Sequence, residues 1–283
     1  MKIVRGIKEM RDLSRKAREE KKRVGFVPTM GALHKGHLSL IRRAREENGA
    51  VFVSIFVNPI QFGPKEDYRR YPRNLKADAR LCGQAGADAI FFPDERSMYS
   101  AGHGTHVCVE GLSDILCGKL RPGHFKGVTT VVAKLFNIVD PDTAYFGQKD
   151  AQQAVIVKKM SGELNMPVTI KVLPTVREKD GLAMSSRNAY LNDRERSDAA
   201  VLFQALTLAK DLLKRRFNDT SLIVRKMKEL INSKRSVKIQ YVCVVDPRSL
   251  RPLHKITGKA LVMLAVKIGG VRLIDNIMVD RNA

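Results

Sequence analysis

Short apolar runs alternate with amphipathic helical patterns through residues 1–175 of this chain. Continuous apolar strands separated by helices are typical of a parallel sheet that helices cover on both faces. The predicted strands are 24–27, 51–57, 89–92, 144–146 and 168–173, with a further short strand at 105–109. The predicted helices are 36–47, 75–85, 127–139 and 151–160. This alternation predicts an α/β fold with a Rossmann-like parallel sheet.

The pattern changes after Thr175. Two amphipathic helices are predicted first, at 194–213 and 221–231, and three strands follow at 239–245, 260–268 and 271–279. Helices followed by hairpin-linked strands indicate a smaller α+β domain. We therefore predict a Rossmann-like domain at 1–175 and a smaller C-terminal α+β domain at 176–283.

Composition limits the classes of protein that remain. No apolar run approaches the ~20 residues that span a bilayer, and the N-terminus lacks the apolar segment of a signal peptide. Four widely spaced cysteines without a C-x-x-C pair indicate reduced thiols and a cytoplasmic protein. No Walker loop or G-x-G-x-x-G occurs, so neither a P-loop ATPase nor a typical NAD enzyme is indicated.

The chain is strongly basic, with 51 Lys and Arg against 29 Asp and Glu and a net charge of +22. Such an imbalance favours anionic partners. The basic residues are spread along the chain, no compact basic tract is interleaved with aromatic residues, and Trp is absent. We therefore expect a nucleotide substrate and neither a nucleic-acid nor a membrane partner, with RNA binding kept as an alternative.

A polar loop with two histidines follows the strand predicted at 24–27. It reads Pro-Thr-Met-Gly-Ala-Leu-His-Lys-Gly-His from Pro28 to His37 and leads into a helical pattern. A helix N-terminus offers unpaired N–H groups and a positive dipole end, which suit phosphate, and the imidazoles add donors. Gly31 and Gly36 lack side chains where a flat ring or a phosphate must come close. The loop indicates a nucleotide site of the H-x-G-H type; the alternative is a turn whose histidines only cap the helix.

Two more polar clusters also follow predicted strands, and parallel sheets bind ligands at the carboxyl ends of their strands. Asn58 and Gln61 follow 51–57, and their amides can orient hydroxyl and carboxylate groups; the alternative is an Asn-Pro turn without a ligand. The segment 147–150, Gly-Gln-Lys-Asp, follows 144–146. Its lysine supplies a point charge for phosphate, and its aspartate caps a helix or accepts from a ribose; Gln153 lies one turn further on. An ordinary Asp-capped helix is the alternative.

The last cluster, residues 174–188, lies at the predicted domain joint and includes Met-Ser-Ser-Arg at 184–187. Its hydroxyls and guanidinium could close over a triphosphate; the alternative is an inter-domain linker. Arg121 and His124 flank a Pro-Gly turn before a helix, where they could reach an anion or simply cap that helix. Asp78 lies on a predicted helix, and its plainest interpretation is a solvated carboxylate.

Together these clusters resemble the pantoate–β-alanine ligase (pantothenate synthetase) family. The matching segments are PTMGALHKGH, FVNPIQFGPKEDYRRYPR, LRPGHFKGVTTVVAKLFNIV, AYFGQKDAQQ and PTVREKDGLAMSSRN. They run in family order from residue 28 to 188, and the C-terminal part has a fitting length and pattern, so the resemblance covers nearly the whole chain. The family belongs to a larger nucleotidyl-transferring group, in which residues 184–187 look like the K-M-S-K-S loop and Arg187 supplies the charge of its second lysine.

The resemblance implies an ATP-dependent ligase that joins (R)-pantoate to β-alanine through pantoyl adenylate and releases AMP and pyrophosphate. It implies Mg²⁺ with the ATP, a homodimer, an N-terminal domain that binds ATP and pantoate, and a C-terminal domain that acts as a lid. The implied catalytic residues are His34, His37, Lys149, Ser185, Ser186 and Arg187. The implied ATP-binding residues are Met30, Gly31, Ala32, Leu33, His34, Lys35, Gly36, His37, Gly147, Gln148, Lys149, Asp150, Val176, Met184, Ser185, Ser186 and Arg187.

For the smaller substrates, the resemblance implies that Asn58, Gln61 and Gln153 bind pantoate and that Gln61 later meets β-alanine. Asp78 resembles a position that family members associate with the metal ion. Two alternatives stay open at this point. One is a nucleotidyltransferase that releases an adenylylated product without making an amide, and the other is an RNA-binding protein without enzymatic activity.

Overall fold

The computed structural model describes residues 1–64 and 66–282. The chain divides into two compact units: Met1–Gly147 with Ile156–Pro174, and Gln148–Val155 with Thr175–Ala283. The last of the three changes of unit, between Pro174 and Thr175, lies next to the boundary predicted near Val176. The short segment 148–155 was not expected to group with the C-terminal part. The binding and lid roles predicted for the two domains stay predictions.

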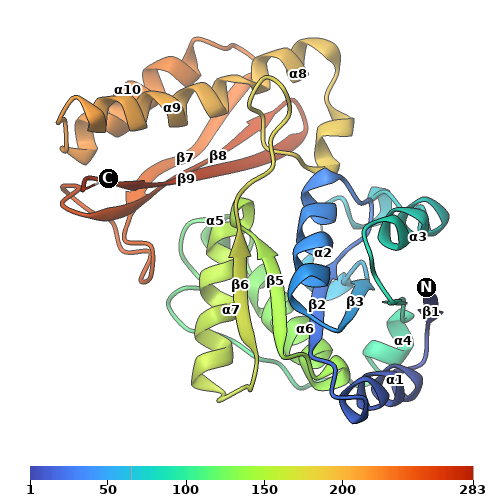
Figure 1. Ribbon diagram of the computed structural model, residues 1–283. Coiled ribbons are helices and arrows are strands. Elements are labelled where there is room, and N and C mark those ends of the chain that lie inside the picture. Colours follow the sequence, from blue (N-terminus) through green and yellow to red (C-terminus); the bar gives the residue numbers. More distant parts are fainter. Residues whose placement is uncertain (65, 283) are drawn as a thin grey trace. The chain divides into compact units, whose positions relative to one another are not determined.

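The first unit contains a six-stranded parallel sheet in the order β1-β4-β3-β2-β5-β6 (Figure 1). Its strands are β1 (Lys2–Val4), β2 (Val24–Thr29), β3 (Ala50–Ile55), β4 (Ala89–Phe91), β5 (Thr143–Gly147) and β6 (Thr169–Leu173). The chain proceeds from β2 outward to β4 and then returns to β5 on the other side of β2. The order therefore reverses between β2 and β5, and ligands in such sheets bind at the strand carboxyl ends beside this reversal.

Helices surround this sheet, and each α-helix predicted for residues 1–175 forms with shifted ends. The helices are α1 (Ile7–Glu19), α2 (Lys35–Glu47), α3 (Leu75–Gln84), α4 (Glu95–Met98), α5 (Cys117–Leu120), α6 (His124–Val139) and α7 (Ala151–Glu163), with 3₁₀ turns η1 (Pro59–Gln61) and η2 (Tyr68–Arg70). A third 3₁₀ turn, η3 (Gln148–Asp150), and the first residues of α7 belong to the second unit. The strand residues Val27, Val51, Val53 and Ile90 pack with Ile41 of α2 in one buried cluster. The continuous apolar runs of the sequence are thus core strands, as a sheet covered by helices requires.

The strand predicted at 105–109 is wrong, although its residues alternate as a strand would. The backbone N–H of Val107 donates to Thr130 Oγ1 (3.0 Å), and Thr129 Oγ1 donates to the carbonyl of Val107 (2.6 Å). Threonine side chains of α6 therefore satisfy the peptide groups that a neighbouring strand would otherwise pair. The elements β1 and α1 were not predicted; α1 buries only Met10, Ser14 and Ala17, which is a weak apolar pattern.

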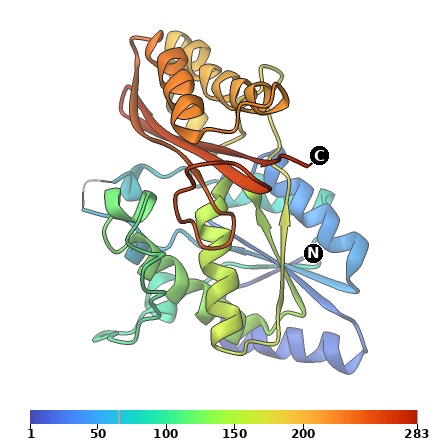
Figure 2. The same cartoon turned by 90° about the vertical axis from the view of Figure 1, so that its left-hand side faces the viewer.

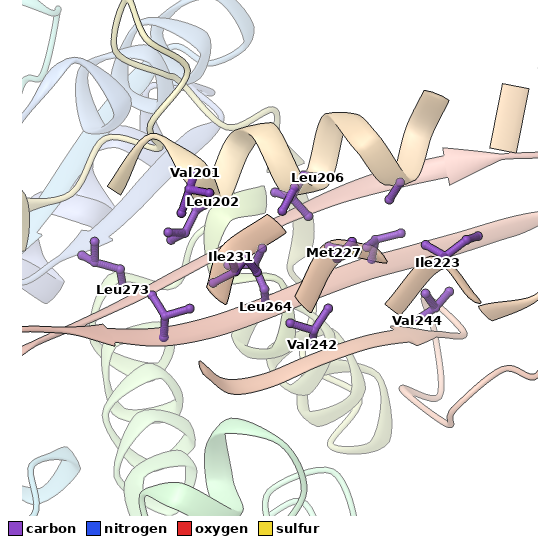
Figure 3. Close-up of a cluster of buried hydrophobic side chains, with 14 of the residues drawn as sticks. Val201, Leu202, Leu206, Ile223, Met227, Ile231, Val242, Val244, Leu264 and Leu273 are labelled. Atoms are coloured by element: carbon purple, nitrogen blue, oxygen red, sulfur yellow. The ribbon is translucent and has the colours of Figure 1, made fainter. Parts of the chain in front are cut away.

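The second unit contains a three-stranded antiparallel sheet, β7 (Val237–Val245), β8 (Lys259–Ile268) and β9 (Val271–Asp280). Its helices are α8 (Asp193–Ala199), α9 (Val201–Lys214) and α10 (Thr220–Asn232), and residues Ser186–Tyr190 form the 3₁₀ turn η4. Helices α9 and α10 cover one face of the sheet (Figure 2). Figure 3 shows the contact between these helices and the sheet, in which Leu202 and Leu206 of α9 and Met227 and Ile231 of α10 lie over Leu264 of β8. The predicted α+β arrangement is confirmed.

The single helix predicted at 194–213 is in fact two helices. Asn192 and Glu195 form a reciprocal capping box that starts α8, and the N–H of Ala200 donates to Ser197 with i+3 spacing where α8 ends. In the part of the chain that the structure describes, no helix has the length and apolar character to cross a membrane.

Candidate active site

The two histidines of the H-x-G-H loop cap helix α2 with their own side chains. His34 is the N-cap residue, and its Nδ1 accepts from the N–H of Gly36 (3.2 Å). His37 Nδ1 accepts from the N–H of His34 (3.3 Å), and the two rings lie 4.1 Å apart between centroids. Because Nδ1 accepts in both rings, the proton of each neutral imidazole lies on Nε2. Capping and donation are therefore compatible: the cap selects the tautomer that carries a donor at Nε2.

Asp78 of α3 holds the loop that precedes these histidines. Its carboxylate accepts from the N–H of Ala32 (2.9 Å) and from the N–H of Leu33 (2.8 Å), and only 3% of the residue is exposed. Gly31 and Ala32 both have positive φ, at 81° and 50°. A Cβ on Gly31 would lie 2.9 Å from Asp78 Oδ2. The interpretation of Asp78 as a solvated carboxylate is wrong, and Gly31 is needed for the approach of this carboxylate.

The predicted pantoate residues Asn58 and Gln61 belong to one buried hydrogen-bonded group. Asn58 Nδ2 donates to Gln61 Oε1 (3.0 Å) and to the carbonyl of Gly127 (3.1 Å). Tyr99 Oη donates to Asn58 Oδ1 (2.7 Å), and Gln61 Nε2 donates to Met30 Sδ (3.0 Å). Burial, with the nearby charge of Glu95, raises the pKa of Tyr99, so its hydroxyl stays a donor. These partners fix the orientation of both amides, and Tyr99 was not found from the sequence.

Arg121 and His124 fix the main chain of Gln61. Arg121 binds the Glu66 carboxylate through Nε (2.7 Å) and Nη2 (2.5 Å), and its Nη1 lies 2.9 Å from His124 Nε2. Guanidinium nitrogens only donate, so His124 accepts at Nε2 and donates from Nδ1 to the Gln61 carbonyl (2.8 Å). Helix α6 has no side-chain cap, so the capping interpretation of these two residues is wrong.

The charge of Glu66 follows from this arrangement. Burial alone would raise the pKa of Glu66. The hydrogen bonds and positive charge of Arg121, together with a hydrogen bond from the backbone of Gly63, bring the pKa below its usual value. Glu66 is therefore a carboxylate at neutral pH, and the Glu66–Arg121 pair is an internal ion pair, with Arg121 12% and Glu66 24% exposed at the side chain.

In the second unit, the predicted phosphate residue Lys149 lies in η3, directly after β5. Its Nζ lies 3.5 Å from Asp150 Oδ1, and its side chain is 22% exposed. The backbone of Gln148 and Lys149 is bound by Asn276 of β9. Gly147, which ends β5, would carry a Cβ with no atom within 4 Å. Gln153 lies in the first turn of α7 and is half-buried.

The segment 174–188 contains the change of unit after Pro174 and is a structured turn, and its predicted role over a triphosphate stays a prediction. Arg177 and Ala183 form an antiparallel bridge, and the N–H of Met184 donates to the carbonyl of Val176 (3.0 Å). Ser185 then caps η4 by accepting from the N–H of Arg187 (3.3 Å). Val176 and the residues 184–187 are thereby held on one short hairpin and the turn that follows it.

The described residues contain no group of three or more His, Cys, Asp or Glu side chains able to hold a metal ion. Both oxygens of Asp78 already accept backbone N–H groups, so this residue has a structural role in holding the loop at Ala32 and Leu33. Its predicted association with a metal ion stays a prediction. The functional assignments of the other site residues also rest on sequence reasoning at this stage.

Sheet order and the capped histidine pair define the class of protein as a Rossmann-like α/β enzyme of the H-x-G-H type. The family model described as pantoate-beta-alanine ligase matches residues 2–278. The chain therefore belongs to the pantoate–β-alanine ligase family, and it is a ligase.

Similar proteins of known name support this membership along the full chain. Pantothenate synthetase from Moorella thermoacetica is 51% identical over 282 residues, covering 100% of both chains. That from Pelotomaculum thermopropionicum is 53% identical over 276 residues, covering 98% of both. The crystal structure of pantothenate synthetase from Thermus thermophilus matches with a TM-score of 0.93 at 44% identity, over 98% of this chain and 99% of that one.

A further solved structure is the pantoate-beta-alanine ligase from Francisella tularensis, complexed with beta-gamma ATP and beta-alanine. It matches with a TM-score of 0.82 at 35% identity, over 100% of this chain and 98% of that one. The predicted α/β fold with a smaller C-terminal α+β part agrees with these relatives.

Proposed function

We propose that the chain joins (R)-pantoate to β-alanine with ATP, through pantoyl adenylate, and releases AMP and pyrophosphate. The observation that carries the proposal is the His34–His37 pair, which combines a helix N-terminus with rings whose proton lies on Nε2. Anions bind well at helix N-termini, and the added donors suit a triphosphate. The Francisella tularensis relative, whose structure contains beta-gamma ATP and beta-alanine, supports the same substrates.

The first step activates a carboxylate that is otherwise a poor electrophile. A pantoate carboxylate oxygen attacks the α-phosphorus of ATP, the bond from that phosphorus to the β-phosphate oxygen breaks, and pyrophosphate leaves. Negative charge grows on the departing phosphates, so donors fixed around them lower the barrier. We assign this task to His34 and His37, with His37 as the main donor, and to Lys149, Ser185, Ser186 and Arg187.

In the second step the neutral amine of β-alanine attacks the acyl carbon of pantoyl adenylate. The bond between the acyl carbon and the AMP oxygen breaks, AMP leaves, and the amine loses a proton as the amide forms. We assign pantoate binding to Asn58, Gln61 and Gln153, with Gln61 also meeting β-alanine. The buried contacts of Asn58 and Gln61 support this assignment. Amides held in one orientation present their donor and acceptor groups to a ligand at fixed positions.

The adenosine of ATP is assigned to Gly147, Asp150, Val176 and Met184, and the loop 30–37 is assigned to the nucleotide as a whole. An ATP-using ligase generally requires a divalent metal ion, and we propose Mg²⁺. Because the described residues form no three-ligand cluster, Mg²⁺ would be held mainly by phosphate oxygens and water, which is common for this ion. When bound, it neutralises phosphate charge. A homodimer, a cytoplasmic location and a lid role for the second unit stay predictions.

The proposal is tested by an end-point assay in which each substrate is omitted in turn. We expect sustained release of AMP and pyrophosphate with equal amounts of amide only when pantoate, β-alanine and ATP are all present. Omission of β-alanine should leave a single turnover of pyrophosphate release and bound adenylate. Accumulation of a free adenylylated product without amide would instead support a nucleotidyltransferase, and it would overturn the proposed ligation.

A further inference from the structure

Asn276 in β9 is a buried residue whose side-chain amide binds the η3 turn, which carries Lys149. Only 2% of the residue is exposed. Its Nδ2 donates to the carbonyls of Gln148 and of Lys149, both at 2.9 Å, and its Oδ1 accepts from Gln148 Nε2 (2.9 Å). Carbonyl oxygens only accept, so the amide nitrogen must face them. One side chain therefore holds the backbone of two successive residues in η3 with two hydrogen bonds and the side chain of Gln148 with a third.

The neighbouring residue on β9 extends these contacts to the hairpin at 177–183. Asp275 accepts from Arg177 through both oxygens, at 2.6 Å from Nη1 and 3.1 Å from Nη2, and also from the N–H of Asn276 (2.7 Å). Arg177 Nη1 donates further to the carbonyl of Gly181 (2.9 Å), and its guanidinium lies 4.4 Å from the ring centre of Phe203. The ion pair is internal, because the Asp275 side chain is fully buried and that of Arg177 is 18% exposed.

Two segments far apart in the sequence are thereby attached to adjacent residues of one strand. One segment carries Lys149, and the other leads directly into Met184 and the residues after it. The strand β9 is itself paired with β8 along its whole length, with Asn276 opposite Met263. A strand paired in this way is a rigid base for flexible side chains.

We propose that Asn276 is a positioning residue for the reaction. It fixes the main chain of Lys149 and thereby the position of the ammonium group that meets the phosphates. From the same strand, Asp275 and its partner Arg177 hold the segment 184–187. This inference rests on the proposed role of Lys149. A lysine has four rotatable side-chain bonds, so the position of its backbone sets the volume that Nζ can reach. A misplacement of about 1 Å in such a group costs about 100-fold in rate.

The central test is the substitution Asn276→Ala in the full-length chain, followed by single-turnover pyrophosphate release with ATP and pantoate. We expect the rate to fall about 10- to 100-fold. The KM for pantoate should stay within about two-fold of the original, because Asn58, Gln61 and Gln153 are all retained. Asn276→Asp is a second variant of the same size: it keeps the acceptor for Gln148 and loses both donations to the carbonyls, so the same slowing is expected.

Thr220→Val is the matched control for general destabilisation of the second unit. Thr220 is 6% exposed, and its hydroxyl also contacts two successive carbonyls, those of Leu253 (2.6 Å) and His254 (3.1 Å). We expect it to lower the melting temperature while leaving the single-turnover rate unchanged. A rate for Asn276→Ala within two-fold of the original would overturn the inference, as would slowing of Thr220→Val by the same factor.

A double-mutant cycle with Lys149→Ala separates this inference from the proposed function. If Asn276 acts through Lys149, Asn276→Ala causes no further slowing in the Lys149→Ala background. Slowing by the full product of the two single effects would show that Asn276 acts elsewhere and overturn the inference. A near-normal Lys149→Ala chain would overturn the role proposed for Lys149, whereas a slow Lys149→Ala with a normal Asn276→Ala would overturn the positioning role alone.

Discussion

His34 and His37 each use Nδ1 to cap helix α2, and this use determines what their rings can offer a substrate. A cap and a catalytic donor were alternatives when only the sequence was considered. The structure shows that one ring can serve as both, because each function uses a different nitrogen. The two functions can therefore be separated by a substitution that keeps an acceptor in place of Nδ1 and removes the donor at Nε2.

The substitution His37→Asn makes this separation. The Asn Oδ1 can take the place of Nδ1 and keep the cap of α2, so we expect stability to change by less than about 1 kcal/mol. The Nε2 donor is lost, and removal of one fixed donor of this kind slows the chemical step about 10²–10³-fold. Single-turnover pyrophosphate release and thermal melting measure the two effects. A near-normal rate in a well-folded His37→Asn chain would remove His37 from the mechanism.

At the level of elements, two polar contacts determine how loops are attached to the sheet and its helices. Asp78 of α3 binds the N–H groups of the loop between β2 and α2. Glu66, through Arg121 and His124, binds the η1 turn to the start of α6. Each contact joins segments that are tens of residues apart, and each has a consequence that can be measured.

For Asp78 we expect Asp78→Asn to loosen the 30–33 loop, because one amide N–H would then face a backbone N–H. The loss of stability should be about 1–3 kcal/mol, with a higher KM for ATP and an unchanged Mg²⁺ concentration for half-maximal activity. Asp246→Asn is the control, since Asp246 accepts the backbone N–H groups of Arg248 and Ser249 on a single oxygen, which asparagine retains. A large rise in the Mg²⁺ requirement of Asp78→Asn would instead favour the metal-associated role.

For Glu66 we expect a pH-dependent contribution to stability. The folded pKa lies below the ordinary glutamate value of 4.5, so the stabilisation is complete above pH 4.5 and is lost as the pH falls through the folded pKa. Glu66→Gln should therefore destabilise the chain at pH 7, by about 1–3 kcal/mol, and the difference should shrink below pH 4.5. Melting temperatures of both chains from neutral to acid pH measure this. A difference that stays constant or widens in acid would contradict it.

At the level of the whole molecule, the order of the strands was the main architectural feature that the sequence left open. The alternation of apolar runs and helical patterns predicted the parallel sheet, and β2 through β6 form close to the predicted ranges. The reversal of order between β2 and β5 could not be read from that alternation. Strand order depends on which faces pack together, and packing joins residues that are distant along the chain.

The residues of the candidate site also divide into those that the sequence predicted and those that only the fold revealed. The loop 30–37 and the residues Asn58 and Gln61 could be found because they follow predicted strands and carry the side chains that phosphates and hydroxyls require. Asp78, Tyr99 and Asn276 have no local signal for their positions. Asp78 lies 45 residues from Leu33 along the chain, and Asn276 lies 127 residues from Lys149. Even where alternation was clear, at 105–109, threonines of α6 supplied the partners in place of a strand.

The sequence by itself determined the local preferences of this protein: apolar runs that form strands, helix starts after polar loops, and family motifs that identify a ligase. Only the tertiary structure decided the strand order, the tautomers of the two histidines and the buried partners that hold each loop. The physical reason is that helix and strand preferences act over a few neighbouring residues, whereas a buried polar group is stable only where folding brings its partner within about 3 Å.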